Sequence, residues 1–182
     1  ADVAAATTSP APAQAHCLFC GAPLHTTFVD LGMSPLCESY LRADQLNQME
    51  PFYPLHTWVC DQCYLVQLEE YVTPDHIFTE YAYFSSYADT WVQHARNYCE
   101  AMIARFGLDG NSHVVEVASN DGYLLQWFVQ AGVPCLGIEP AANVAKVAVE
   151  KGVPTRVEFL GVECARRMVA EGLAADVIAG NN

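Results

Sequence analysis

The sequence predicts an α/β protein in which a small β domain precedes a parallel, doubly wound sheet. Two observations carry this prediction. Four cysteines stand in two Cys-x-x-Cys pairs in the first part of the chain, among short β-prone runs and Gly and Pro turns. From His113 onward, short apolar runs alternate with helical stretches, which is the pattern of a parallel sheet with crossover helices.

Four segments are expected along the chain. Residues 1–16 are rich in Ala, Thr and Pro and lack the basic start and apolar stretch of a signal peptide, so we expect a flexible tail. Residues 17–75 form the cysteine-bearing domain, and residues 76–110 form an aromatic segment with a linking helix. Residues 111–182 form the parallel sheet.

Composition narrows the range of partners. Apolar residues make up 52% of the chain, which suits a globular protein. The formal net charge of −13 argues against nucleic acid, because a phosphate backbone is bound by clustered Lys and Arg. No apolar run approaches the roughly 20 residues of a membrane-spanning helix. We therefore expect neither a nucleic acid nor a membrane as partner.

The paired cysteines predict a structural zinc site with the ligands Cys17, Cys20, Cys60 and Cys63. Each Cys-x-x-Cys turn places two thiolates on one side of a tetrahedron, and two turns leave no position for water or substrate. Disulfides, a redox dithiol and chance pairing are the alternatives, but the doubled spacing favours metal. A zinc-ribbon-like β domain and a cytoplasmic location follow. The other cysteines are expected to be small buried hydrophobes: Cys37, Cys99, Cys135 and Cys164.

In the first domain, strands are expected at Thr26–Leu31, Pro54–Val59 and Tyr64–Leu68. Between Asp89 and Gly107, apolar residues recur at three- and four-residue spacing, which predicts an amphipathic helix that packs between the domains. The stretch before this helix is dense in aromatic and hydroxyl side chains. It could line a pocket by stacking on a flat base, or it could pack the domain junction, and the sequence leaves both readings open.

The second domain alternates strands and helices in chain order. The expected strands are Val114–Val117, Pro134–Ile138, Val153–Val157 and Ala175–Ala179. The expected helices are Gly122–Ala131, Ala141–Lys151 and Gly161–Glu171. This alternation predicts a Rossmann-like parallel sheet. Its last strand would leave an apolar edge open, so we expect an incomplete sheet and a chain that is part of a longer protein.

The loop after the first of these strands carries a cofactor signature. A dinucleotide fingerprint would be G-x-G-x-x-G, whereas the run from Glu116 to Gly122 has the form E-x-A-x-N-x-G. Bound pyrophosphate needs backbone without side chains in its way, which disfavours NAD. S-adenosyl-L-methionine has no pyrophosphate. Asn120 or Asp121 is expected to cap a helix that starts near Gly122, with free amides for the cofactor's carboxylate.

Two further positions complete this expected pocket. Glu139 follows the second strand, where an acid can accept hydrogen bonds from both ribose hydroxyls. Asn181 and Asn182 follow the fourth strand and border the same crevice. We therefore expect S-adenosyl-L-methionine to be bound by Glu116, Ala118, Ser119, Asn120, Asp121, Gly122, Glu139, Pro140, Asn181 and Asn182.

Taken in order, these motifs resemble the zinc-binding class I SAM-dependent C-methyltransferases, whose characterised members methylate nucleotide-linked deoxysugars. The resemblance covers nearly everything after residue 16. The segments that carry it are Cys17–Gly21, Leu31–Leu36, Cys60–Cys63, Tyr81–Ser86, Glu116–Gly122, Gly137–Ala141 and Gly180–Asn182.

The resemblance implies a zinc-bearing domain, a Rossmann-like methyltransferase core and a carboxy-terminal domain. It also implies a mechanism in which a base removes the proton next to a keto group of a dTDP-linked sugar, and the carbanion takes the methyl group. By position, Tyr81 and Tyr83 would be catalytic, and Ser85 and Ser86 would bind the nucleotide-sugar or other small-molecule acceptor. The family's remaining catalytic residues come after the point where this chain ends, so we expect the segment alone to be inactive.

Two other functions stay open. One is an NAD-dependent oxidoreductase with a structural zinc site. The other is a non-catalytic zinc-ribbon interaction module, which would bind zinc and no adenosyl compound. The sequence indicates neither the acceptor's identity nor the oligomeric state.

Overall fold

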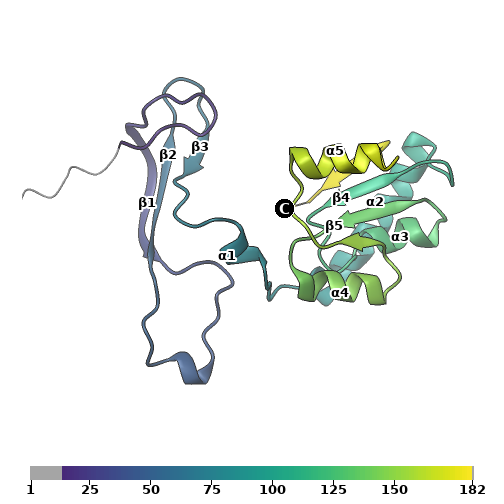
Figure 1. Ribbon diagram of the computed structural model, residues 1–182, viewed down its shortest axis with the longest axis horizontal. Coiled ribbons are helices and arrows are strands. Elements are labelled where there is room, and N and C mark those ends of the chain that lie inside the picture. The colour runs from purple at the N-terminus through teal and green to yellow at the C-terminus, as the bar shows by residue number, and fades with distance from the viewer. Residues whose placement is uncertain (1–13, 182) are drawn as a thin grey trace, which may run out of the picture. The chain divides into compact units, whose positions relative to one another are not determined.

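The computed structural model describes residues 14–181 and resolves them into two compact units, divided between Thr73 and Pro74 (Figure 1). The flexible tail expected over residues 1–16 lies for the most part outside the described residues. Within the described range, no helix combines the length and the hydrophobicity that crossing a membrane requires.

The first unit is built on an antiparallel sheet with the strand order β1-β2-β3. The strands are β1 (Thr26–Ser34), β2 (Tyr53–Val59) and β3 (Val66–Leu68). The register between β1 and β2 shifts at two places, as it does at β-bulges. The loop that joins these two strands contains a short 3₁₀ helix, η1 (Ala43–Gln45). The three predicted strands are confirmed, the first continuing to Ser34 and the third beginning at Val66.

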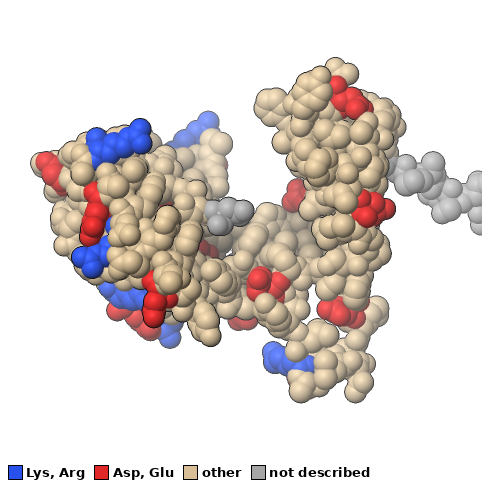
Figure 2. All heavy atoms as spheres, turned by 180° about the vertical axis from the view of Figure 1, so that it is seen from behind, with Lys and Arg blue, Asp and Glu red and all other residues tan. Residues whose placement is uncertain are grey.

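The first unit has a very small apolar core. Its buried cluster consists of Cys17, Leu24 and Cys60. Large apolar side chains are exposed instead, among them Phe19 at 81% and Met49 at 95%. Most of the face of this unit seen in Figure 2 is neither acidic nor basic. Because so small a core rarely stabilises a domain, this unit needs a further crosslink.

The second unit carries a parallel sheet with the strand order β6-β5-β4-β7. The strands are β4 (Val114–Val117), β5 (Cys135–Ile138), β6 (Thr155–Arg156) and β7 (Val177–Gly180). This order is half of a doubly wound sheet, so the predicted α/β, Rossmann-like class is confirmed. The third strand is shorter than the predicted Val153–Val157, because only two of its residues pair with β5.

Helices cover both faces of this sheet. They are α2 (Asp89–Phe106), α3 (Leu125–Gln130), α4 (Ala142–Glu150) and α5 (Val162–Ala170). One core cluster joins side chains of α2, α3 and α4 to the sheet, and a second joins α5 to the opposite face, so the unit has three layers (Figure 1). Before α2, the aromatic segment contains only α1 (Asp75–Phe78) and the 3₁₀ turn η2 (Ser85–Tyr87).

The helix after β4 starts later than the sequence predicts. It begins at Leu125 instead of Gly122, and no side chain caps its first turn. The expected capping role of Asn120 or Asp121 is therefore wrong. The reason lies in the backbone, since Ala118 (φ 54°), Asn120 (φ 50°) and Gly122 (φ 75°) all adopt left-handed conformations, which a right-handed helix excludes. The E-x-A-x-N-x-G run is thus a compact loop.

A glycine in β5 is required by close packing against this loop. A Cβ added at Gly137 would lie 2.3 Å from Oγ and 2.9 Å from Cβ of Ser119, which is fully buried. We expect Gly137→Ala to lower the free energy of unfolding of the second unit by about 1–3 kcal/mol, as overpacked cores do. Urea unfolding followed by tryptophan fluorescence measures this change.

Gly161→Ala is the matched control for that prediction. An added Cβ at Gly161 meets no atom within 4 Å, and the residue has a negative φ of −149°. Its free energy of unfolding should change by less than about 0.5 kcal/mol. Equal unfolding midpoints for the two variants would contradict the close contact between Gly137 and Ser119.

Candidate functional site

The structure brings the four predicted cysteine ligands together. The Sγ atoms of Cys17, Cys20, Cys60 and Cys63 all lie within 4.8 Å of one another. Two of the S–S separations, Cys17 to Cys63 and Cys20 to Cys60, are 3.6 Å. Four thiolates bound to zinc at about 2.3 Å in a tetrahedron lie about 3.8 Å apart. The cluster therefore fits a tetrahedral zinc ion, and all four cysteines are free thiols without disulfide bonds.

The two cysteine pairs form equivalent turns. In the first turn, the backbone N–H of Gly21 donates to the carbonyl oxygen of Cys17 at 2.9 Å. In the second, the backbone N–H of Tyr64 donates to the carbonyl oxygen of Cys60 at 3.0 Å. Both closing residues have positive φ, 73° for Gly21 and 62° for Tyr64. The same backbone turn thus presents two thiols from each side of the cluster.

A buried glutamine supports this cluster. The side chain of Gln67 donates from Nε2 to Sγ of Cys17 at 3.2 Å and accepts from the backbone N–H of Leu18 at 2.7 Å. The backbone N–H of Cys20 and this amide lower the pKa of Cys17 to about 6. For Cys63, the Leu65 backbone N–H lowers the pKa, but burial and the neighbouring thiols raise it to about 12. Sequence reasoning missed Gln67, because a single polar residue in a short strand carries no signal.

The other cysteines do not join the cluster. Cys99, Cys135 and Cys164 are buried in the second unit, as expected of small hydrophobes. Burial raises the pKa of Cys99 to about 12 and that of Cys135 to about 11, so these thiols are held in the neutral form. Cys37 is exposed, and its expected burial is wrong.

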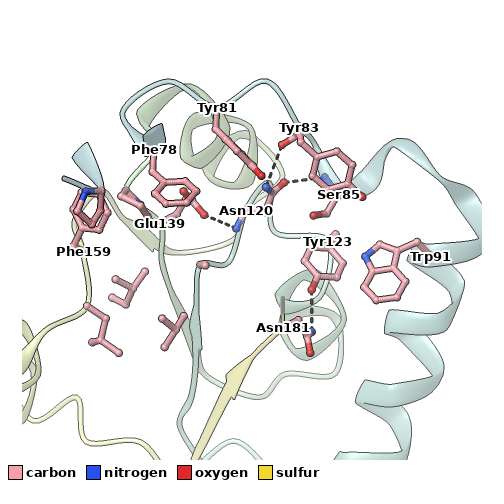
Figure 3. Close-up of a pocket in the computed structure, with 16 residues that line it drawn as sticks. Phe78, Tyr81, Tyr83, Ser85, Trp91, Asn120, Tyr123, Glu139, Phe159 and Asn181 are labelled. Atoms are coloured by element: carbon pink, nitrogen blue, oxygen red, sulfur yellow. Dashed lines mark hydrogen bonds between the residues drawn. The ribbon is translucent and has the colours of Figure 1, made fainter. Parts of the chain in front are cut away.

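The second unit contains a cavity of about 470 Å³ at the carboxyl ends of β4, β5 and β7 (Figure 3). Aromatic side chains surround much of it, several from the segment before α2. Among the residues that the structure describes, Glu139 is the one charged side chain in this lining. The lining residues are Pro74, Phe78, Tyr81, Tyr83, Ser85, Trp91, Val117, Ala118, Asn120, Tyr123, Ile138, Glu139, Pro140, Phe159, Leu160 and Asn181.

The predicted cofactor and substrate residues divide into two groups. Those that line the cavity are Tyr81, Tyr83, Ser85, Ala118, Asn120, Glu139, Pro140 and Asn181. Those that the structure places outside the lining are Glu116, Ser119, Asp121, Gly122 and Ser86. Asn182 lies outside the described residues.

Sequence reasoning missed most of the aromatic wall. Trp91 stacks with Tyr123 at a ring-centroid distance of 5.9 Å, and both border the cavity beside Asn181 (Figure 3). Phe159 and Leu160 also line the cavity. These last two follow the third strand at the same sheet edge as Glu139, a position that the strand order could have indicated.

Glu139 is fixed between two backbone segments. Its Oε2 accepts from the N–H of Asn120 and its Oε1 from the N–H of Ala141, both at 2.8 Å. The side chain is 5% exposed, so its direction is locked by these bonds and by burial. Each carboxylate oxygen keeps a further lone pair that can accept a hydrogen bond from a ligand.

The amides of the loop after β4 are engaged within the protein. The N–H groups of Ser119 and Gly122 donate to backbone carbonyls at 3.3 and 3.1 Å. The N–H of Asn120 donates to the carboxylate of Glu139, and the N–H of Asp121 donates to the side-chain Oδ1 of Asn120 at 2.9 Å. The free amides expected at this helix start are therefore absent from residues 119–122, because the loop turns back on itself before α3 begins.

A second acid, Glu116, lies outside the cavity lining and interacts with Tyr123. Glu116 is fully buried, and burial raises its pKa well above the ordinary value, with the nearby Glu139 and Asp121 raising it further. Burial, together with the charge of Glu116, also raises the pKa of Tyr123 to about 12. The Tyr123 hydroxyl accepts from Nδ2 of Asn181 at 2.9 Å (Figure 3). Tyr123 thus presents a neutral, oriented hydroxyl at the cavity.

Comparison with known proteins bears on both units. Residues 17–78 match the model of a family described as a putative zinc binding domain. The chain is also 36% identical over 139 residues to the C-methyltransferase NovU of Streptomyces niveus. The chain is therefore similar both to a putative zinc binding domain and to a C-methyltransferase. The resemblance that the sequence motifs indicated is confirmed.

The match to this C-methyltransferase covers 76% of the chain and 33% of the relative, so the chain spans about a third of the curated relative's length. A solved structure described as the crystal structure of MccD protein is similar over 47% of this chain and 31% of its own. Its sequence identity is 21% and its TM-score is 0.27, a likeness too slight to bear on the fold.

Proposed function

We propose that the chain supplies the zinc-bearing domain and the S-adenosyl-L-methionine pocket of a C-methyltransferase whose acceptor is a nucleotide-linked deoxysugar. One observation carries the cofactor. An aromatic cavity opens at the carboxyl ends of parallel strands, and within the described part of the chain its single charged lining group is the fixed carboxylate of Glu139. The deoxysugar rests on the resemblance of the motifs to the family.

The cavity suits S-adenosyl-L-methionine in size and charge. A volume of about 470 Å³ lies in the usual range of small-molecule sites. The sulfonium centre is positively charged, and aromatic faces such as those of Tyr81 and Trp91 attract cations. Glu139 has the position and the free lone pairs to accept from ribose hydroxyls.

The same observations count against a dinucleotide. A bound pyrophosphate is stabilised by backbone N–H groups and by Lys or Arg. Residues 119–122 have their N–H groups engaged within the protein, and the described lining residues include neither Lys nor Arg. NAD is therefore the weaker candidate for this cavity.

When bound, S-adenosyl-L-methionine supplies an electrophilic methyl group. The chain's own residues would bind and orient it, with Glu139 at the ribose and the loop residues Ala118 and Asn120 along the methionyl part. Tyr81, Tyr83 and Ser85 line the cavity from the aromatic segment and would contact the acceptor. Tyrosine hydroxyls can take part in proton removal next to a keto group, and positioned acid–base help contributes about 10²–10⁴-fold.

The zinc ion would be structural in this proposal, since four thiolates close its coordination shell. Thiolate ligands must stay reduced, which supports a cytoplasmic location. Neither a nucleic acid nor a membrane is proposed as partner, in keeping with the net charge of −13.

Calorimetric titration of S-adenosylhomocysteine into the zinc-loaded chain tests the cofactor. We expect a one-to-one complex, and no heat from NADH under the same conditions. Binding of NADH without S-adenosylhomocysteine would favour the oxidoreductase. A folded, zinc-replete chain that binds neither compound would favour the interaction module.

A further inference from the structure

The wall of the cavity formed by residues 78–87 has little structure of its own. After α1 ends at Phe78, the only regular element is the three-residue turn η2. Tyr83 is 49% exposed and Tyr87 is 93% exposed, so burial of these side chains contributes little to holding the segment in place. Polar contacts with the rest of the second unit add to the packing of the half-buried Tyr81 and Phe84.

The first of these contacts comes from α4. Asn143 accepts from the backbone N–H of Tyr81 with Oδ1 at 3.1 Å and donates to the backbone carbonyl of Tyr81 from Nδ2 at 2.8 Å. The two bonds thus engage both the N–H and the C=O of one residue, as pairing with a neighbouring strand does. Asn143 is 62 positions away in the sequence and fixes the direction in which Tyr81 leaves the backbone.

The second contact comes from Lys151, just after α4. Its Nζ donates to Oγ of Ser86 at 2.7 Å and to both Oδ2 and the backbone carbonyl of Asp121 at 3.0 Å. Oδ2 of Asp121 also accepts from the backbone N–H of Ser86 at 3.3 Å. The Asp121 side chain is 2% exposed, so this ion pair is shielded from water on one side. Lys151 thereby ties the aromatic segment to the loop after β4.

A third contact involves the loop itself. Asn120 donates from Nδ2 to the carbonyl of Tyr83 at 3.1 Å and accepts with Oδ1 from the N–H of Ser85 at 2.8 Å (Figure 3). Asn120 lines the cavity, so a substitution there would alter the ligand's own contacts. Asn143 and Lys151 do not line it and can be changed without touching a ligand.

We infer that Asn143 and Lys151 are positioning residues: they hold Tyr81–Ser86 as a wall of the cavity, so that ligand affinity depends on two side chains that the ligand does not touch. The identity of the ligand rests on the proposed function. The role of Asn143 and Lys151 in fixing the position of Tyr81–Ser86 does not depend on it. Linkage requires the converse as well. A ligand that contacts the held segment must stabilise the held state by the same factor.

Two measurements on the zinc-loaded chain test this inference. S-adenosylhomocysteine affinity is measured by calorimetry, and opening of the segment is measured by chymotrypsin cleavage, with the cut sites located by mass spectrometry. Lys151→Met and Asn143→Leu should each weaken binding about tenfold, the size expected when hydrogen bonds to a charged or bracketing group are lost. Both should speed cleavage after Tyr81, Tyr83 and Phe84.

Two further variants separate positioning from general damage. Lys151→Arg keeps a charged donor and should recover most of the affinity. Lys146→Met removes a lysine of α4 whose side chain is 75% exposed and whose ion-pair partner among the described residues is Glu150, at 3.8 Å. It should leave affinity and cleavage unchanged. Thermal unfolding of every variant shows which ones are folded. If Lys151→Met does not fold, Asn143→Leu alone carries the test.

The outcomes separate this inference from the proposed function. Normal affinity and normal cleavage in folded Lys151→Met and Asn143→Leu would overturn the inference. If the unchanged chain binds no S-adenosylhomocysteine, the proposed cofactor fails, and the cleavage rates alone decide whether the two residues hold the segment. If Lys146→Met weakened S-adenosylhomocysteine binding as much as Lys151→Met does, the inference would also be overturned, because the loss of any positive charge from this region would then explain the effect.

Discussion

Replacing Cys60 by serine is expected to release zinc and to unfold the unit of residues 14–73. Cys60 is fully buried at the cysteine cluster, and a hydroxyl is a far poorer zinc ligand than a thiolate. Structural zinc contributes about 10–16 kcal/mol in small domains, which is as large as the whole stability of most proteins. The unit's apolar core holds only three buried residues and cannot make up the loss.

Zinc per chain, measured by elemental analysis, and far-ultraviolet circular dichroism test this prediction. We expect about one zinc per chain before the substitution and little after it, with loss of the β signal. Cys37→Ser is the matched control, because Cys37 is exposed and lies outside the cluster. It should keep both the metal and the spectrum. A Cys60→Ser chain with full zinc and an unchanged spectrum would show that the cluster is not the metal site.

Glu139→Gln is expected to weaken S-adenosylhomocysteine binding about 100-fold, which corresponds to about 2.7 kcal/mol. The carboxylate accepts from two backbone N–H groups, of Asn120 and Ala141. An amide has one acceptor oxygen, so its NH₂ group would face one of these donors and leave that buried N–H without a partner. An unsatisfied buried N–H costs about 1–3 kcal/mol, and the ligand's ribose also loses a charged acceptor.

Calorimetry on the two glutamate variants measures this effect. Glu150→Gln is the control, since Glu150 lies at the exposed end of α4 with 63% of its side chain accessible. Its affinity should stay within about twofold of the unchanged chain. Equal affinities for Glu139→Gln and the unchanged chain would mean that the carboxylate neither shapes the loop nor contacts the ligand.

The metal centre was predictable from the sequence almost completely. Two residues between paired cysteines dictate a turn with both thiols on one side, and this geometry is local. Gln67, which donates to Cys17 across 50 positions, was not predictable, because no local pattern marks a residue that completes a distant hydrogen bond.

The cofactor cavity was predictable only in outline. Strand and helix periodicity placed the loop after β4 and the acid after β5, because parallel strands direct their carboxyl ends to one edge. The left-handed residues Ala118 and Asn120 were not anticipated, since their φ values are maintained by contacts with the rest of the unit. These contacts use the amides that the sequence had suggested were free.

The sequence by itself thus determined the α/β class, the cysteine ligands and the order of the elements, because each depends on spacing along the chain. Only the tertiary structure decided which loop side chains face the cavity and what holds its aromatic wall. Asn143 meets Tyr81 across 62 positions, and Lys151 meets Ser86 across 65. Pairs so far apart are brought together by the packing of α4 on the sheet, and neither residue type carries a signal of its own.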